Sequence, residues 1–200
     1  MDGYQLRTEK KKEKIRNVAI ELFLNFGIEK VSIAEIAKKA SVSPVTIYNH
    51  FGTKDELVRK VITSFLQKEW ENRLEITNRE ELSFHEKIEM MVFETESISG
   101  KTNPEFLNSL INGDPELQKM IEEMYHQYLP SIVEFFEEGK KQGYMDPDIS
   151  NETIMIYLNL LKNAMSGFQF YDDHEKNSKL AKDLSKFFFY GLLNKAPDRK

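Results

Sequence analysis

The chain has 200 residues, 40% hydrophobic and 30% charged, a balance typical of a globular protein and unlike a disordered or fibrous one. It contains no cysteine, which excludes disulfides, zinc fingers and thiol catalysis. Its apolar runs are far shorter than the roughly 20 residues that a membrane helix needs, and its first residues do not resemble a signal peptide. We therefore expect a cytoplasmic protein without a membrane partner.

The net charge of −5 is unevenly distributed along the chain. Residues 1–70 contain 13 Lys and Arg against 9 Asp and Glu, a net charge of +4. Residues 71–200 contain 15 against 24, a net charge of −9. A basic front and an acidic body indicate two parts with different partners, with nucleic acid as one candidate for the front. A chance fluctuation in composition is the alternative.

Helix-like periodicity dominates from the N-terminus onward, because apolar residues recur every three or four positions over 8–26. Gly27 then stands where a helix commonly ends in the left-handed conformation. Ser32, Thr53 and Ser83 each precede a glutamate by three residues, the capping-box pattern of a helix start. We expect an all-α protein of about nine helices, over 8–26, 33–40, 44–51, 54–75, 83–99, 104–111, 115–141, 151–171 and 178–194.

Three of these helices begin with a capping residue followed by proline. The caps are Ser43, Asn103 and Asp114. Proline is well suited to the first helical position, because the N–H it lacks would have no intrahelical partner there. A polar segment at 76–82 is a candidate hinge, and it lies just beyond the change in charge.

Residues 31–50 combine two short helices separated by a three-residue turn. Ile36 and Ala37 form the inner face of the first helix, and Ile47 and Phe51 form that of the second, with Val42 filling the turn. A small residue such as alanine allows a second helix to cross closely. This arrangement indicates a DNA-binding helix-turn-helix, although an ordinary helical hairpin with a solvated face has the same spacing.

A longer set of residues favours the DNA-binding alternative. The most specific segment is 47–54, Ile-Tyr-Asn-His-Phe-Gly-Thr-Lys. The whole set is Phe23, Phe26, Gly27, Val31, Ser32, Ile33, Ile36, Ala37, Val42, Ser43, Thr46, Ile47, Tyr48, His50, Phe51, Lys54, Glu56 and Leu57. This pattern closely resembles the N-terminal domain of the TetR (tetracycline repressor) family, and the resemblance covers about residues 8–68.

Two residues depart from that family pattern. Ser41 stands where family members often have glycine, so serine must adopt the turn geometry at some energetic cost. Ala34 stands where some members present arginine to DNA, so this chain should read fewer bases with its first motif helix.

The resemblance and the side-chain chemistry together predict the DNA contacts. Pro44, Val45 and Asn49 are the expected base readers, with valine suited to a thymine methyl group and asparagine to adenine. Thr46 is expected to contact phosphate or base, and Tyr48, His50 and Lys54 to donate to phosphate oxygens. Ser32 and Ser43 cap helices whose N-terminal amides also face phosphates. The lysine-rich run at 10–16 is either a solvated helix start or a further phosphate contact.

For the acidic body the family implies only an architecture, a helical domain that binds an effector and forms dimers over about 76–195. The helix over 151–171 is apolar on two sides, with Ile154 and Leu158 on one and Ile156 and Leu160 on the other. We expect it to form a homodimer together with the helix over 178–194. Burial within one protomer is the alternative.

An aromatic and methionine-rich interior is the candidate site for a small hydrophobic effector of unknown identity. An ordinary hydrophobic core has the same composition. The expected lining residues are Phe84, Ile88, Met91, Phe106, Met124, Tyr125, Tyr128, Met165 and Phe168.

The expected function is therefore that of a sequence-specific transcriptional regulator, a repressor that leaves its operator when the effector binds. A helical protein-interaction adaptor without DNA binding is the alternative. An enzyme is not expected, because the sequence has no catalytic motif, no metal site and no sign of a cofactor.

Overall fold

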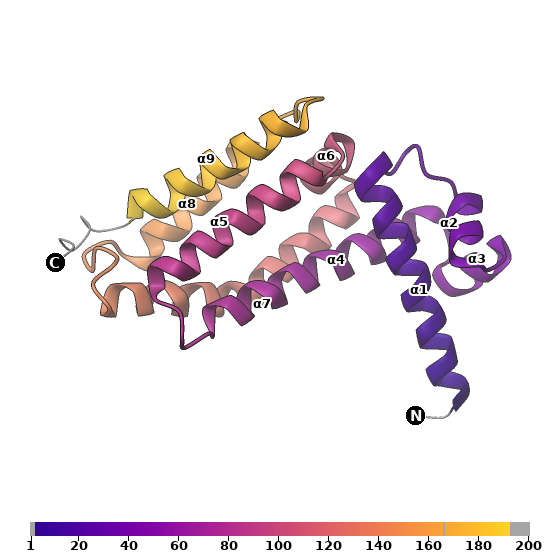
Figure 1. Cartoon of the computed structure of the whole chain (residues 1–200), viewed down its shortest axis with the longest axis horizontal. Coiled ribbons are helices and arrows are strands. Elements are labelled where there is room, and N and C mark those ends of the chain that lie inside the picture. Colours follow the sequence, from indigo (N-terminus) through magenta and orange to yellow (C-terminus); the bar gives the residue numbers. More distant parts are fainter. Residues whose placement is uncertain (1–2, 166, 193–200) are drawn as a thin grey trace.

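A computed structural model of the chain describes residues 3–165 and 167–192. The described part confirms the all-α class and contains nine helices (Figure 1). None of the described helices is long and apolar enough to cross a membrane. The helices are α1 (Gly3–Phe26), α2 (Ile33–Ala40), α3 (Pro44–Phe51), α4 (Lys54–Thr77), α5 (Phe84–Lys101), α6 (Pro104–Asn112), α7 (Pro115–Lys141), α8 (Asn151–Met165) and α9 (His174–Leu192).

The predicted helix starts are confirmed where local capping specifies them. Ser32, Thr53 and Ser83 each accept a hydrogen bond from the backbone N–H of the glutamate three residues later, and each glutamate accepts from the cap in return. Asn103 and Asp114 cap α6 and α7 ahead of their prolines. These hydrogen bonds close within three residues, so the surrounding sequence is sufficient to specify them.

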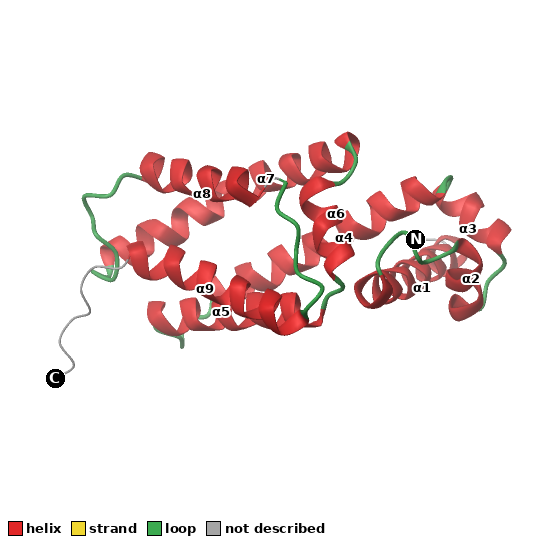
Figure 2. Cartoon of the chain, turned by 90° about the horizontal axis from the view of Figure 1, so that it is seen from above, coloured by secondary structure: helices red, strands yellow, loops and turns green. Residues whose placement is uncertain are grey.

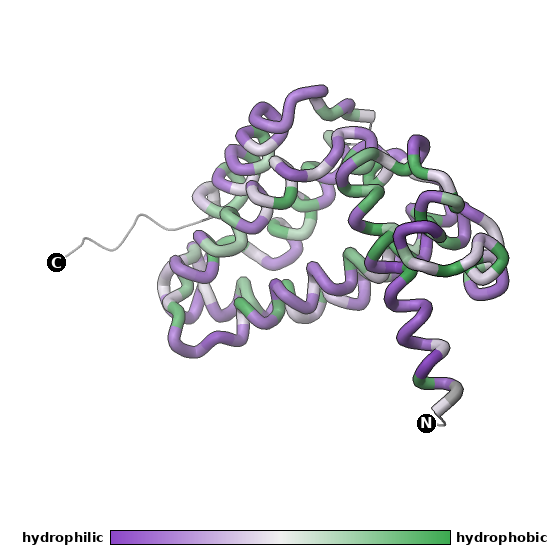
Figure 3. The backbone as a smooth tube through the Cα atoms, turned by 45° about the vertical axis from the view of Figure 1, so that its right-hand side comes forward, coloured by the Kyte–Doolittle hydropathy of each residue, from purple (hydrophilic) through white to green (hydrophobic). Residues whose placement is uncertain are grey.

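Three helix boundaries differ by more than two residues from those expected. Helix α1 begins at Gly3, five residues earlier than expected, and its hydrophilic first turns project away from the rest of the molecule (Figure 3). Helix α8 ends at Met165 rather than 171, and α9 begins at His174 rather than 178. The remainder of the expected last helix, beyond residue 192, lies outside the described residues.

The helices form two packed groups, a smaller one around α1, α2 and α3 and a longer bundle of α5, α7, α8 and α9, with α4 running from one to the other (Figure 2). The front cluster is the hydrophobic core of the smaller group and includes the fully buried Phe23 and Ile36. The body cluster is the core of the bundle and includes Phe84 and Phe136. Phe106 of α6 belongs to the front cluster although it lies far along the chain.

Ser41, the turn residue of the helix-turn-helix, is the one residue other than glycine with a positive φ in the described part of the chain, at 59°. An L-residue in this left-handed conformation costs about 1–2 kcal/mol, and glycine avoids that cost. Because glycine also gains entropy in the unfolded chain, we expect Ser41→Gly to raise the free energy of unfolding by only about 0.5–1 kcal/mol.

Chemical denaturation of the two variants Ser41→Gly and Ser64→Gly measures this effect. Ser64 is an exposed residue inside helix α4, where glycine should lower the free energy of unfolding by about 0.5 kcal/mol. Equal destabilisation by both substitutions would show that the turn at Ser41 is not strained.

Candidate DNA-binding interface and effector cavity

Helices α2 and α3 form a compact hairpin because their facing residues are small or apolar. Ala37 is 1% exposed and Ile47 is also 1% exposed. The turn between them is fixed by the backbone N–H of Val42, which donates to the carbonyl oxygen of Ala37 at 3.0 Å. The helix-turn-helix geometry therefore follows from close packing that the sequence pattern had indicated.

The outer face of α3 carries most of the residues expected to read DNA. Val45 is 64% exposed and Tyr48 is 50% exposed, and Pro44 and Asn49 are also exposed. An exposed face of this length, one short helix capped at its N-terminus, matches what a DNA major groove admits. Its side chains are free to contact base edges.

Thr46 and His50 are less accessible than the sequence suggested, because both are half-buried. The hydroxyl of Thr46 lies 2.9 Å from that of Ser43, and its backbone N–H donates to the same Ser43 oxygen. Thr46 therefore already takes part in capping α3, which limits what its hydroxyl can offer to DNA.

Lys54 also has an intramolecular role. Its side chain is half-buried, and Nζ donates to the carbonyl oxygen of Ile28 at 3.1 Å. An ammonium group has three donors, so this contact leaves two of them for other acceptors. Lys54 thus joins the start of α4 to the loop after α1 and keeps its charge beside the end of α3.

The caps next to this face also set the charge of two glutamates. The backbone N–H of Ser32 holds the pKa of Glu35 below its usual value, and that of Thr53 does the same for Glu56. Both carboxylates are solvent-exposed and stay ionised at neutral pH, near the helix N-termini where a negative charge is favourable.

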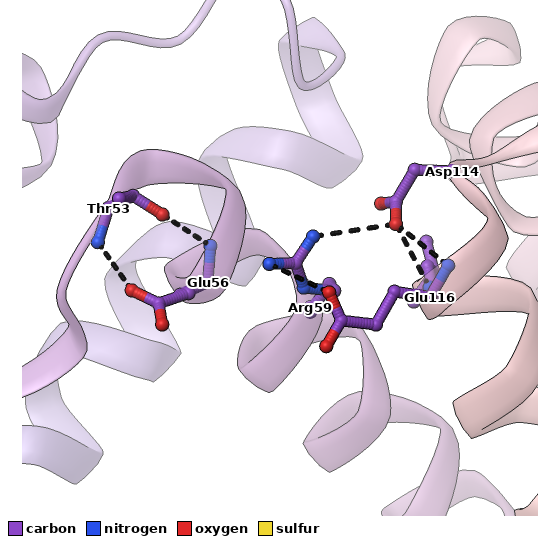
Figure 4. A network of polar contacts seen from close by, with 6 residues as sticks. Thr53, Glu56, Arg59, Asp114 and Glu116 are labelled. Atoms are coloured by element: carbon purple, nitrogen blue, oxygen red, sulfur yellow. Dashed lines mark hydrogen bonds and ion pairs between the residues drawn. The ribbon is translucent and has the colours of Figure 1, made fainter.

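An ion-pair network links the second turn of α4 to the first turn of α7 (Figure 4). The Arg59 guanidinium lies 3.4 Å from Asp114 Oδ1 and 3.2 Å from Glu116 Oε2. Asp114 also caps α7 by accepting from the backbone amides of Glu116 and Leu117. The sequence does not reveal this network, because Arg59 and Asp114 are 55 residues apart and only the cap at Asp114 has a local signature.

Helix α6 makes a second contact between the body and the helix-turn-helix unit. The Asn103 backbone N–H donates to the carbonyl oxygen of Leu24 at 2.7 Å, and Glu105 Oε1 accepts from the backbone of Glu29 at 3.1 Å. Gly27 allows this approach, since its φ is +83° and a Cβ there would lie 1.6 Å from Glu105 Oε2. The end of α1 is therefore held directly by the start of α6.

A cavity of about 360 Å³ lies in the bundle among α4, α5, α7, α8 and α9. Met91 and Tyr125 are the expected effector residues that line it, together with the aromatic rings of Phe135 and Phe136. A second cavity of about 330 Å³ is lined by Met124, Met165 and again Tyr125. Cavities of this size fall at the lower end of the range for small-molecule sites.

Five expected pocket residues line neither cavity. Phe84 and Ile88 are 1% exposed inside the body cluster, and Phe106 is fully buried in the front cluster. Tyr128 stacks on Trp70 with ring centroids 5.2 Å apart, and Phe168 packs edge-on against Phe170. These five residues were expected to line the effector cavity because apolar residues of a core and of a cavity wall recur at the same helical spacing.

Most residues that line the first cavity were not among those expected, and Trp70 and Arg73 of α4 are two of them. Trp70, Leu74 and Thr77 are spaced by four and three residues on α4, so they share one face of the helix. This spacing could have predicted that Trp70 lines the cavity. Nothing in the sequence distinguishes Arg73 from a surface arginine.

Two large apolar side chains on the surface of α8 opposite the bundle core are uncovered in this chain, among exposed polar residues. Ile156 is 54% exposed and Leu160 is 60% exposed, whereas Ile154 on the other side is fully buried. On α9, Phe187 is 72% exposed. Large apolar side chains at this degree of exposure are typical of a surface that another molecule covers. Within the described residues no group of three or more His, Asp or Glu side chains is arranged to hold a metal ion.

Comparisons with known proteins agree with this geometry. A family model described as "Bacterial regulatory proteins, tetR family" matches residues 15–61. The HTH-type transcriptional regulator YhgD of Bacillus subtilis is 28% identical over 153 residues, which cover 75% of this chain and 80% of YhgD.

Two solved structures share the fold over nearly their whole length. The transcriptional regulator FadR from Bacillus subtilis, in complex with stearoyl-CoA, has a TM-score of 0.61 at 18% identity and covers 90% of this chain and 98% of its own. A regulator from Saccharomonospora viridis, in complex with choline, has a TM-score of 0.66 at 14% identity and covers 94% of this chain and all of its own.

Proposed function

The chain belongs to the TetR family of bacterial regulatory proteins, and from that premise we propose that it represses transcription as a homodimer in the cytoplasm. It is a DNA-binding transcriptional regulator, so the helical-adaptor alternative is not favoured. Residues 8–68 would read the operator, and 76–195 would bind the effector and form the dimer. The observation that carries this proposal is the exposed, capped face of α3 beside a fully buried α2 face.

The dimer would place the two α3 helices in successive major grooves of a near-palindromic operator, about 34–36 Å apart. The uncovered apolar residues of α8 and α9 support a two-fold pairing of these helices. Such a pairing removes the exposed apolar surface from water, which is the main source of stability in obligate interfaces. The dimer would therefore set the distance between the two helix-turn-helix units at residues 31–50, the reading heads.

Effector binding would release DNA by favouring a protomer conformation with a different separation of the reading heads. Helix α4 is suited to transmit that change, because Arg73 at one end lines the cavity and Leu57 at the other is fully buried in the front cluster. The contacts of Arg59 with α7 and of Asn103 with α1 are additional links between body and reading head. A shift of α4 or α6 would move the helix-turn-helix as one unit.

The experiment that tests DNA reading is selection of the fragments that the purified protein retains from random duplex DNA, followed by affinity measurements at several salt concentrations. Asn49→Ala should relax the preference at one base position by about 1–3 kcal/mol, because it removes a base contact. Lys54→Ala should weaken binding to all DNA sequences equally, because it removes a phosphate contact. It should also reduce the salt slope, the dependence of log affinity on log salt concentration, by about one.

Lys119→Ala is the matched control, since Lys119 is an exposed lysine on α7 in the acidic body, outside α8 and α9. It should leave both affinity and salt slope unchanged. Thermal melting of the Lys54 variant separates a DNA effect from loss of the hydrogen bond to Ile28. An unchanged salt slope for Lys54→Ala would contradict its assignment to phosphate, and failure to retain any DNA would contradict the proposed function.

A further inference from the structure

The cavity in the bundle contains one charged side chain, that of Arg73. The rest of its wall is apolar or hydroxylic, and no aspartate or glutamate lines it. The Arg73 guanidinium carbon lies 5.7 Å from the centroid of the Trp70 ring, so the cation is placed over an aromatic face. A positive charge therefore faces an apolar cavity.

Arg73 lacks a close counter-ion. None of the ion pairs in the described part of the chain includes it, although Glu69 and Glu94 are near enough to interact electrostatically. Burial lowers the pKa of the Arg73 guanidinium, while the two carboxylates raise it. Burial also raises the pKa of Glu69, and the nearby Arg73 charge opposes that rise. Arginine stays protonated in such surroundings, so its charge is only partly compensated.

A second donor belongs to the same wall. The hydroxyl of Tyr125 is buried without a hydrogen-bond partner, and burial raises the pKa of this phenol, so it stays protonated. A buried donor without a partner costs free energy that a ligand acceptor can recover. Arg73 thus offers hydrogen-bond donors to the cavity and the aromatic rings offer apolar surface, whereas the Tyr125 hydroxyl is enclosed and would have to turn to reach a ligand.

We propose that the effector is an amphipathic anion, with a carboxylate head at Arg73 and an apolar tail along the Trp70, Phe135 and Phe136 rings. This inference rests on the proposed function, because it names the ligand class of the effector cavity. The fold alone does not decide the charge, since similar structures hold stearoyl-CoA and choline. A cationic ligand would meet Arg73 and find no carboxylate on the wall.

Trp70 is the single tryptophan of the chain and lines the cavity, so its fluorescence reports binding without a label. The full-length protein is titrated, in the absence of DNA, with decanoate, decan-1-ol and decyltrimethylammonium, which share a tail and differ in head charge. We expect decanoate to bind about tenfold to a hundredfold more tightly than decan-1-ol, the range of a charge-assisted hydrogen bond.

Three variants identify the source of that preference. Arg73→Gln should abolish the preference for decanoate, because it weakens decanoate binding while changing the affinity for decan-1-ol by less than about twofold. Arg73→Lys should retain part of the preference because the charge is kept. Arg79→Gln is the control, because Arg79 is exposed outside the cavity and pairs with Glu81. Tighter binding of decyltrimethylammonium, or a decanoate preference that persists in Arg73→Gln, would overturn the inference.

The result is independent of the DNA experiment. An Arg73-dependent preference for decanoate supports the anion site even if the protein retains no DNA. Retention of DNA without such a preference overturns the anion site and leaves the regulator assignment intact.

Discussion

Leu160→Asp is expected to convert the protein into monomers and to lower operator affinity by about 10² to 10⁴-fold, the gain that linking two half-site contacts provides. Leu160 is 60% exposed in the protomer, so aspartate there should leave the fold of each protomer unchanged. Because the proposed dimer is two-fold symmetric, the aspartates of both copies would be buried in the interface without a positive partner. Burying an unpaired charge strongly destabilises an interface.

Sedimentation measures whether the variant is monomeric, and DNA retention measures its operator affinity. Leu6→Asp is the control for sedimentation, because Leu6 is 47% exposed on α1, remote from α8 and α9. Gly191→Asp is a second probe of the interface on α9, where a side chain would have open space in the protomer. Dimers that persist in both Leu160→Asp and Gly191→Asp would refute α8 and α9 as the interface.

Phe106→Ala should lower the free energy of unfolding by about 3–5 kcal/mol, the usual cost of removing a buried aromatic ring. Phe106 is fully buried on α6, and its ring lies edge-on to Phe65 of α4 with centroids 6.0 Å apart. Loss of the ring would leave a void between α6 and the front cluster and weaken the link between body and reading head.

Denaturant unfolding at a fixed protein concentration provides the measurement, because the stability of the proposed dimer would depend on concentration. Phe93→Ala is the control and should change the free energy of unfolding by less than about 0.5 kcal/mol, since that ring is mostly solvated. A cost below about 1 kcal/mol for Phe106→Ala would mean that α6 does not complete the front core.

The helix-turn-helix was predictable from sequence because the interactions that form it are short in range. The capping pairs of Ser32 and Thr53 close within three residues, and the packing of Ala37 against the next helix spans fewer than fifteen. The left-handed turn at Ser41 was also predictable, since the family pattern places glycine there.

The break between α8 and α9 depended on distant residues. Asn112 Oδ1 accepts from the Gly167 backbone N–H, and Asn108 Oδ1 accepts from that of Phe170. The fully buried Asn177 binds both the N–H and the carbonyl of Tyr171. These side chains occupy backbone groups that a longer α8 would have used, so the helix ends at Met165 despite the apolar pattern that continues beyond it.

The sequence by itself determined the capped helix starts, the α2–α3 hairpin and the resemblance to the TetR family, because each depends on local hydrogen bonds or on a contiguous motif. The tertiary structure alone decided which apolar residues form a core and which line a cavity. It also placed Arg73 in that cavity and Arg59 against Asp114. The physical reason is that burial and charge pairing depend on which helices meet, and residues far apart in the chain meet only after folding.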